Sequence, residues 1–371
     1  MSAAPTLERL SRNAARAWLG RHASRPGSSL LSLASATLAL YLAWIVLDWL
    51  FLSAPPPWAA ASSCAGAAGA CWPFWMEKSR FILFGTYPFD QQWRPLLASL
   101  VLIALSVATG RMAVSGRWPD MRLLAVTWLC GMAASFLLMG GGVFGLAPVD
   151  ATRWNGLPIL LILSTIALAL ALPVGVLLAL ARYQTRHPLL RRASGAYVEI
   201  MRGVPMVTLL FVGVFVLPLT LPKGMAIEPI TAVLVALVFF HAAYFAEDVR
   251  SGLMSLPAGQ HEAASALGLG FWQTVRLVLL PQSIERAMPA LVNSTIGAYK
   301  DTSLVVILGL HDLSATARMA FSDVAWGNQA LEAYVFVGLW FLLSCSYLSW
   351  IGRRLATRGA AGRSRSTRNS D

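Results

Sequence analysis

The sequence predicts an all-α fold, a polytopic membrane bundle of about eight transmembrane helices. Of its 371 residues, 57% are apolar and only 12% are charged, and the mean hydropathy is +0.63. A soluble domain carries about twice that charged fraction, so this composition cannot cover a water-facing surface. Apolar runs of about 20 residues recur along the chain, and a helix of that length crosses a hydrocarbon layer of about 30 Å. Basic residues gather between alternate runs, which is typical of membrane topology.

Eight apolar runs define the predicted spans. They cover residues 29–52, 95–115, 121–146, 157–181, 203–222, 229–249, 288–310 and 331–352. With the N-terminus placed in the cytoplasm, 22 of the 29 lysines and arginines fall inside, and Lys300 falls within a span. Inside loops of membrane proteins carry such an excess of positive charge. We therefore expect a multi-pass protein of the cytoplasmic membrane with both termini in the cytoplasm.

The spans divide the chain into four regions. A basic N-terminal segment precedes the first span, and a basic tail follows the last. Between them lie a three-span accessory region with a long outside loop and a five-span core with a long inside loop. The boundaries are 1–28 for the N-terminal segment, 29–155 for the accessory region with its outside loop 53–94, 156–352 for the core with its inside loop 250–287, and 353–371 for the tail.

The accessory region contains three features besides its spans. Four tryptophans of the outside loop favour an aromatic belt at the membrane interface over a ligand site. They are Trp58, Trp72, Trp75 and Trp93. Cys64 and Cys71 lie in the same loop, which can hold a disulfide, and the sequence leaves open whether they are bridged. A glycine cluster at 140–145 interrupts the third apolar run, where we expect small residues to allow close helix packing.

Several kinds of site are missing from the sequence. A phosphate-binding P-loop needs a lysine directly after a glycine, and none of Lys78, Lys223 and Lys300 follows one. The five histidines are scattered without an HExxH motif, and neither a CxxC pair nor a GxSxG elbow is present. We therefore expect no catalytic residue, metal or cofactor on this chain. The arginine clusters indicate membrane topology rather than nucleic-acid binding.

The inside loop 250–287 predicts two short amphipathic helices interrupted at Gly268-Leu269-Gly270. Glu262 near the start of the first helix is favourable to the helix dipole. Ala263, Ala264, Ala266 and Leu267 form a small, tight-fitting face, and Gly268 permits a sharp turn. Such a hairpin either packs on its own bundle or docks into a groove of a partner, and both alternatives stay open at this point.

The same loop resembles the cytoplasmic signature of bacterial ABC importer permeases. That signature is Glu-Ala-Ala, three residues, Gly, nine residues, an aliphatic residue, one residue and Leu-Pro. It is matched from Glu262 to Pro281, with Val278 at the position that is usually isoleucine. The motifs at 197–205, 242–250, 280–282 and 300–304 resemble the polar amino acid (histidine/glutamine-type) subfamily. The resemblance covers about residues 156–352, and the three extra spans look like the longer permease of general L-amino acid systems.

The resemblance implies a five-helix type I importer core and a role without enzymatic activity. Two permease chains, either copies or different chains, would form a pathway through the bacterial inner membrane. A dimer of ATP-binding subunits would hydrolyse ATP, and a periplasmic protein would deliver polar L-amino acids, of the glutamate, glutamine, aspartate and asparagine type or a broader range. The residues implied to contact the ATP-binding subunit are Glu262, Ala263, Ala264, Gly268 and Pro281.

Two charged clusters interrupt the apolar spans. Lys300, Asp301, Thr302 and Ser303 lie about 18–20 Å into the run 288–310, near the bilayer midplane. Charges at that depth are costly, so these residues either pair with another span or line the substrate path. In the second case Asp301 suits an α-ammonium group, and Lys300 or a hydroxyl group suits an α-carboxylate. The cluster 247–250 at the inner end of a span favours a salt-bridged anchor over a gate.

A rival hypothesis is an ion-coupled secondary amino acid transporter, which also places charges at the middle of the membrane. It predicts inverted repeats with broken helices, and no repeat is visible in the sequence. It also has no use for a glycine-broken inside hairpin. A structural or assembly role leaves Asp301 without an explanation. The permease hypothesis accounts for both the hairpin and the charged span.

Overall fold

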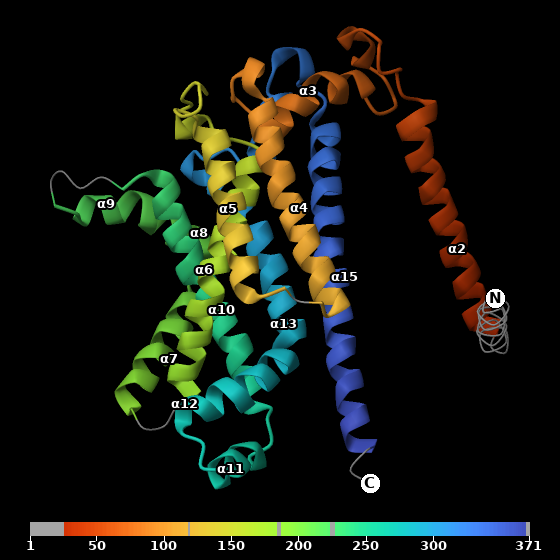
Figure 1. Ribbon diagram of the computed structural model, residues 1–371. Helices are drawn as coiled ribbons and strands as arrows, with labels where there is room; N and C mark the ends of the chain where they lie inside the picture. The colour runs from red at the N-terminus through yellow and green to blue at the C-terminus, as the bar shows by residue number, and fades with distance from the viewer. Residues whose placement is uncertain (1–25, 118, 184–186, 223–226, 369–371) are drawn as a thin grey trace. The chain divides into compact units, whose positions relative to one another are not determined.

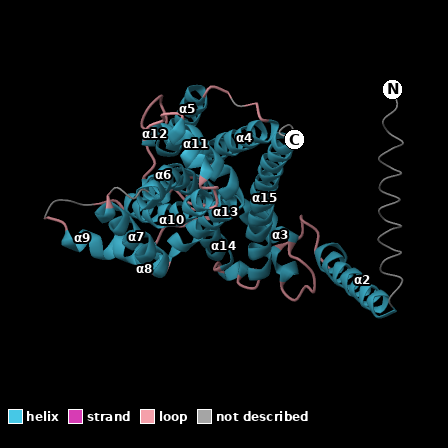
Figure 2. Ribbon diagram, turned by 90° about the horizontal axis from the view of Figure 1, so that it is seen from below, coloured by secondary structure: helices cyan, strands magenta, loops and turns pink. Residues whose placement is uncertain are grey.

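The computed structural model describes residues 26–117, 119–183, 187–222 and 227–368. Within these ranges the chain forms helices and no β-strand (Figures 1 and 2), and an isolated bridge pairs Gly156 with Asp312. This confirms the predicted all-α fold. The predicted basic segment 1–28 lies mostly outside the described residues.

Six of the described helices are long and apolar enough to cross a membrane. The spans begin with α2 (Pro26–Leu47), which continues as a π-helical turn through Leu52. The other five are α4 (Trp93–Ser115), α5 (Met121–Gly140), α6 (Leu157–Tyr183), α10 (Pro229–Met254) and α15 (Ala330–Arg368). Six of the eight predicted spans are therefore confirmed as continuous helices.

The predicted span 203–222 belongs to a bent pair of segments, which passes the test of length and apolar composition only when the two segments are taken together. α7 (Pro188–Gly203) meets the stretch Met206–Thr220 at 104°. Val204 at the break is extended, because the ring of Pro205 disfavours helical backbone in the residue before it. The second segment consists of α8 (Met206–Phe211), a π-helical turn (Val212–Val216) and α9 (Leu217–Thr220).

The eighth predicted span, 288–310, differs from the others. It is the second half of α13 (Leu280–Asp301), followed by the 3₁₀ helix η7 (Thr302–Leu308). The first turns of α13 hold Gln282, Glu285 and Arg286, and the helix ends in Lys300 and Asp301. α13 is therefore too polar to stand among the six long apolar helices, and the count of eight spans is approximate.

Two helix ends differ from the sequence expectations. α5 stops at Gly140 rather than near residue 146, because Gly141, Gly142 and Gly145 all have positive φ. These glycines turn the chain sharply, so the expectation of close helix packing was wrong for them. α15 continues as a helix to Arg368, so the predicted tail 353–371 begins inside a helix.

The chain divides into two compact units, Met1–Glu77 and Lys78–Asp371. In the first, the Trp72 indole donates to the Leu50 carbonyl oxygen over 2.8 Å, and the rings of Trp72 and Trp75 meet edge to face. Cys64 ends a short 3₁₀ helix (Ala61–Cys64) and forms a disulfide with Cys71. α3 (Trp72–Phe84), which the sequence did not predict, contains the boundary between the units.

The core of the second unit is built on α6, α10 and α13. Gly175 of α6 lies so close to α10 that a Cβ there would come within 2.6 Å of the Phe245 Cβ. Gly252 of α10 meets the backbone of α13 in the same way. α4 packs on α15, where the Tyr347 hydroxyl donates to the Val107 carbonyl oxygen over 3.1 Å. The accessory helix α4 is therefore part of the same packed body as the core helices.

Shorter elements connect these helices. They are η3 (Phe89–Gln91), η4 (Ala151–Arg153), α11 (Gly259–Ala266), α12 (Phe271–Thr274), the π-helical turn η6 (Val275–Leu279), α14 (Leu313–Phe321) and η8 (Val324–Trp326). α11 and α12 lie at one end of the bundle, on the same side as α7 (Figure 1).

Candidate functional site

The hairpin at this end of the bundle is shaped by a glycine turn. α11 ends in a Schellman motif, in which Gly268 N–H donates to the Ser265 carbonyl over 2.9 Å. The Leu269 N–H donates to the Ala264 carbonyl over 3.1 Å. Gly268 has φ +74°, the left-handed conformation that this motif needs and that glycine adopts without strain. The predicted interruption at Gly268-Leu269-Gly270 is therefore a helix C-cap.

The second helix of the hairpin is not a separate short element. α12 begins after Gly270, whose N–H donates to the Gln273 side-chain oxygen over 3.0 Å. It then continues through η6 into α13. The Gln282 side-chain amide donates to the Gln260 side-chain oxygen over 2.9 Å, which ties α13 to α11. The hairpin is thus connected to α13 both along the chain and through this hydrogen bond.

The predicted contact residues are mostly exposed on this hairpin. Glu262, Ala263, Gly268 and Pro281 face outward, whereas Ala264 is only 3% exposed and turns toward its own bundle. Sequence reasoning placed Leu267 on the docking face but missed Trp272 and Leu277, which follow the turn. Leu267, Trp272 and Leu277 are 81%, 67% and 64% exposed.

A cluster of ion pairs joins the helices next to the hairpin. Glu247 of α10 accepts from Arg182 of α6 over 2.6 Å and from Arg250 of its own helix. Arg202 of α7 lies 3.8 Å from the same carboxylate. The neighbouring Asp248 accepts from the Ser294 hydroxyl of α13 over 2.6 Å. This geometry matches the salt-bridged anchor that the sequence favoured at 247–250.

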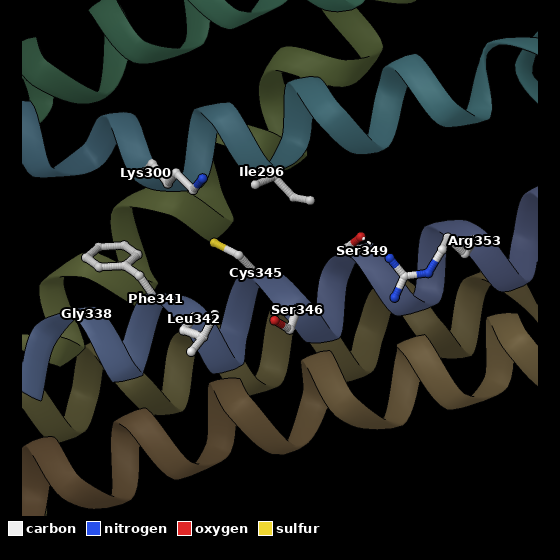
Figure 3. A pocket seen from close by; sticks show the side chains of 9 residues that line it. All are labelled: Ile296, Lys300, Gly338, Phe341, Leu342, Cys345, Ser346, Ser349 and Arg353. Atoms are coloured by element: carbon white, nitrogen blue, oxygen red, sulfur yellow. Dashed lines mark hydrogen bonds between the residues drawn. The ribbon is translucent and has the colours of Figure 1, made fainter. Parts of the chain in front are cut away.

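The four residues of the predicted substrate path do not share one face. Lys300 lines an open pocket of about 510 Å³ between α13 and α15, with Phe341 and Cys345 opposite (Figure 3). Thr302 is buried, and its hydroxyl donates to the Tyr299 carbonyl over 2.7 Å. Successive residues of a helix point roughly 100° apart, which accounts for the divergence.

Asp301 has a neighbour that the sequence did not identify. Its carboxylate oxygen lies 3.8 Å from Nε2 of His241 on α10. The Asp301 side chain is 37% exposed, whereas the His241 side chain is 5% exposed, and its Nε2 has no hydrogen-bond partner in the described part of the chain. Asp301 is thus accessible on one side and contacts a buried imidazole on the other. The two residues are 60 positions apart in the sequence, so no local pattern relates them.

Ser303 contacts the element that follows η7. The Ser314 hydroxyl of α14 donates to the Ser303 hydroxyl over 3.4 Å. Asp312 caps α14 by accepting from the Ala315 N–H over 3.0 Å, and burial raises the pKa of this carboxyl. Asp312 therefore serves to begin a helix, and Ser303 lies beside that cap rather than beside Lys300. Among the described residues, no group of three His, Cys, Asp or Glu side chains is arranged to hold a metal ion.

Comparison with known proteins places these features in one family. Residues 171–359 match the family described as binding-protein-dependent transport system inner membrane component. The inner membrane amino-acid ABC transporter permease protein YhdY of Escherichia coli (strain K12) is 38% identical over 342 residues, which are 91% of this chain and 90% of that protein.

Two further relatives differ in how much of the chain they match. The glutamate/glutamine/aspartate/asparagine transport system permease protein BztC of Rhodobacter capsulatus is 33% identical over 75% of this chain and 76% of its own length. The glutamine transport system permease protein GlnP of Escherichia coli (strain K12) is 33% identical over 55% of this chain, but 94% of its own length. GlnP therefore matches almost all of its own length but has no counterpart to much of this chain.

Proposed function

This chain belongs to the family of binding-protein-dependent transport system inner membrane components, and on that premise we propose that it conducts polar L-amino acids inward. As a multi-pass inner membrane permease subunit, it hydrolyses no ATP itself. The hydrolysis belongs to a partner ATP-binding subunit. The names of the relatives support the substrate class, because one carries amino acids in general and two carry glutamine or its acidic and amide relatives.

The hairpin is the proposed contact with the ATP-binding subunit. The observation that carries this proposal is the exposure of Leu267, Trp272 and Leu277 at and after the hydrogen-bonded glycine turn. In a helical membrane protein such residues normally face lipid or the protein core, and here they sit beside the polar Glu262 and Gln273. A large apolar patch with a polar rim is typical of a protein–protein interface. Ala264 is buried, so it would pack the hairpin against its own bundle and would not touch the partner.

Asp301 and Lys300 are the proposed substrate-path residues. Asp301 keeps an accessible carboxylate beside His241, and Lys300 opens into the α13–α15 pocket. A zwitterionic amino acid needs one acceptor for its ammonium group and one donor for its carboxylate. Asp301 is the proposed acceptor, and Lys300, which points to another face of α13, would donate at a different point of the path. Thr302 is a weaker candidate, because its hydroxyl already donates to the Tyr299 backbone. Ser303 is also a weaker candidate, because its hydroxyl lies beside Ser314 of α14.

The proposed orientation follows from the arginine distribution. Both termini and the hairpin lie in the cytoplasm, where ATP is available. The disulfide-bonded loop lies in the periplasm, where a substrate-binding protein would deliver the amino acid. A second permease chain, either a copy or a relative, completes the pathway. The ion-coupled alternative loses support, because the family of this chain depends on a binding protein.

Reconstitution tests the proposal. The full chain is purified in mild detergent with whatever subunits accompany it, and the complex is placed in liposomes with a substrate-binding protein outside. Uptake of labelled glutamate and glutamine should require ATP inside the liposomes and the binding protein outside. Uptake driven by a sodium or proton gradient without ATP would instead establish the ion-coupled alternative.

A further inference from the structure

A second pocket, separate from Lys300 and Asp301, lies among α6, α7 and α10 at the hairpin end of the bundle. Its volume is about 410 Å³. Its lining consists of Arg182, Arg191, Arg192, Gly195, Ala196, Glu199 and Arg250. Four guanidinium groups therefore face a space that contains a single lining carboxylate. Such an excess of positive charge in a cavity is suited to an anion.

The four arginines have different partners. Arg182 and Arg250 both form ion pairs with Glu247, which holds their guanidinium groups in place. Arg191 and Arg192 on α7 are exposed, and neither side chain makes a hydrogen bond or ion pair with another described residue. The positive charge of these two side chains is thus available to a ligand, while the other two are fixed.

The floor of the pocket is made by the smallest residues of α7. Gly195 lies in the middle of this helix, where glycine is unfavourable compared with alanine. A Cβ at this position would lie 3.8 Å from Nε of Arg182, which is an ordinary contact. Helix geometry therefore does not require the glycine, and a larger side chain here would occupy the pocket. The glycine keeps the space between the arginines open.

The surroundings of α7 indicate where the anion comes from. Val198 on one face of α7 is buried in a cluster with Ala243 and Ala246 of α10. On the outer side, Leu189 and Ile200 are 80% and 59% exposed. A helix with one packed face, exposed apolar side chains and a basic edge is typical of a helix at the membrane surface. The pocket also adjoins Arg182, in the last turn of the span α6.

We propose that this pocket binds the phosphate group of an anionic phospholipid. Guanidinium groups match phosphate oxygens in paired hydrogen bonds, and basic pockets between spans hold anionic headgroups. The bound phosphate bridges α7 to Arg182 and Arg250, so it joins the same three helices that Glu247 already connects. A lipid in this position stabilises the end of the bundle on which the hairpin is mounted.

Thermal unfolding of the full chain in an uncharged detergent tests this proposal. Phosphatidylglycerol or cardiolipin should raise the unfolding midpoint with added lipid, because a ligand that binds the folded state stabilises it. Phosphatidylcholine of the same chain length should have little effect. The double substitution R191Q/R192Q should leave the lipid-free midpoint unchanged and weaken the apparent lipid affinity about thirtyfold.

Two further variants separate the pocket from the general charge of the surface. Gly195→Leu fills the floor without changing charge, and it should also weaken lipid binding. R117Q/R122Q removes two exposed arginines outside the pocket, and it should retain the lipid response. If inorganic phosphate alone gives a shift that R191Q/R192Q abolishes, the anion site stands and its ligand is soluble phosphate. A lipid response that survives R191Q/R192Q, or that R117Q/R122Q reduces equally, would overturn the proposal.

Discussion

The α11–α12 hairpin exposes large apolar side chains, whereas the junction between α13 and η7 partly buries a charged one. The hairpin exposes Leu267, Trp272 and Leu277 to solvent. The junction half-buries Asp301 beside the imidazole of His241. Apolar exposure and charge burial each carry a free-energy cost in an isolated chain. The two regions lie on the same continuous helical path, because α12 leads through η6 into α13 and ends at Asp301.

The difference indicates that the two regions are suited to different kinds of ligand. Exposed apolar side chains beside a turn match a protein partner, whereas an accessible carboxylate within the predicted span 288–310 matches a small charged substrate. A continuous helical path through η6 and α13 connects the two places. We infer that coupling between ATP hydrolysis and the substrate path depends on α13. The predictions below separate the partner contact from the substrate contact.

Asp301→Asn should have the largest effect. If the carboxylate binds the α-ammonium group common to all amino acids, uptake of every substrate should fall about 10-fold to 100-fold, since hydrogen bonds to charged groups contribute about 1.5–3 kcal/mol. ATP hydrolysis should continue with poor linkage to transport. Uptake of several labelled amino acids, normalised to the complex present in the membrane, measures this.

The exposed Asp90 provides a matched control, because Asp90→Asn makes the same chemical change outside the path. Full uptake of all substrates by Asp301→Asn at normal abundance would reject the site. If abundance falls while uptake per complex stays normal, Asp301 serves only as a structural partner of His241.

Gly268→Asp should impair the partner contact while sparing the fold. The φ of +74° costs a non-glycine residue about 1 kcal/mol or more, which a folded membrane bundle tolerates. A Cβ at this position meets nothing within 4 Å, so the new carboxylate projects from the turn into open space. We expect normal membrane abundance, weaker retention of the ATP-binding subunit and loss of substrate-stimulated ATP hydrolysis.

Gly259→Asp is the control for this substitution. Gly259 begins α11 and also has open space around it, but its φ is not positive. An aspartate in the first turn of a helix is favourable. This variant should therefore remain coupled. Normal substrate-stimulated hydrolysis in Gly268→Asp would contradict the assignment of the hairpin.

Leu267→Ala should have a smaller effect on the same contact. The side chain is 81% exposed, so its truncation should leave the free energy of unfolding nearly unchanged. Interface truncations that matter cost more than about 1 kcal/mol, which predicts about fivefold to tenfold weaker binding of the ATP-binding subunit. Leu219→Ala on α9 removes an equally exposed leucine away from the hairpin. Equal binding by both variants would mean that Leu267 faces no partner.

Cysteine labelling should leave transport unchanged and define the side of the membrane on which each region lies. In a background where Cys130 and Cys345 are replaced by serine, Cys64 and Cys71 are the remaining cysteines. An impermeant maleimide should label intact cells only after reduction, because the pair is bridged and lies outside. Labelling that requires permeabilisation would reverse the proposed orientation and remove the hairpin from the cytoplasm.

Local sequence determined the spans and the turn of the hairpin. Hydrophobic length decides whether a helix can cross a membrane, and this property belongs to each segment alone. The same holds for Gly268, since a helix C-cap depends on a few neighbouring residues. Local reasoning failed at 140–145. We expected close helix packing there, but Gly141, Gly142 and Gly145 have positive φ and turn the chain.

Only the tertiary structure decided which distant side chains meet. His241 reaches Asp301 because α10 packs closely on α13, where Gly252 leaves room for the α13 backbone. The basic pocket forms because α7 packs beside α6 and α10, which brings Arg191 and Arg192 next to Arg182 and Arg250. Hydropathy and turn preferences act over a few residues, whereas these contacts depend on how closely whole helices pack against one another. The sequence by itself therefore determined the membrane bundle and its hairpin, and packing decided the partners of its buried charges.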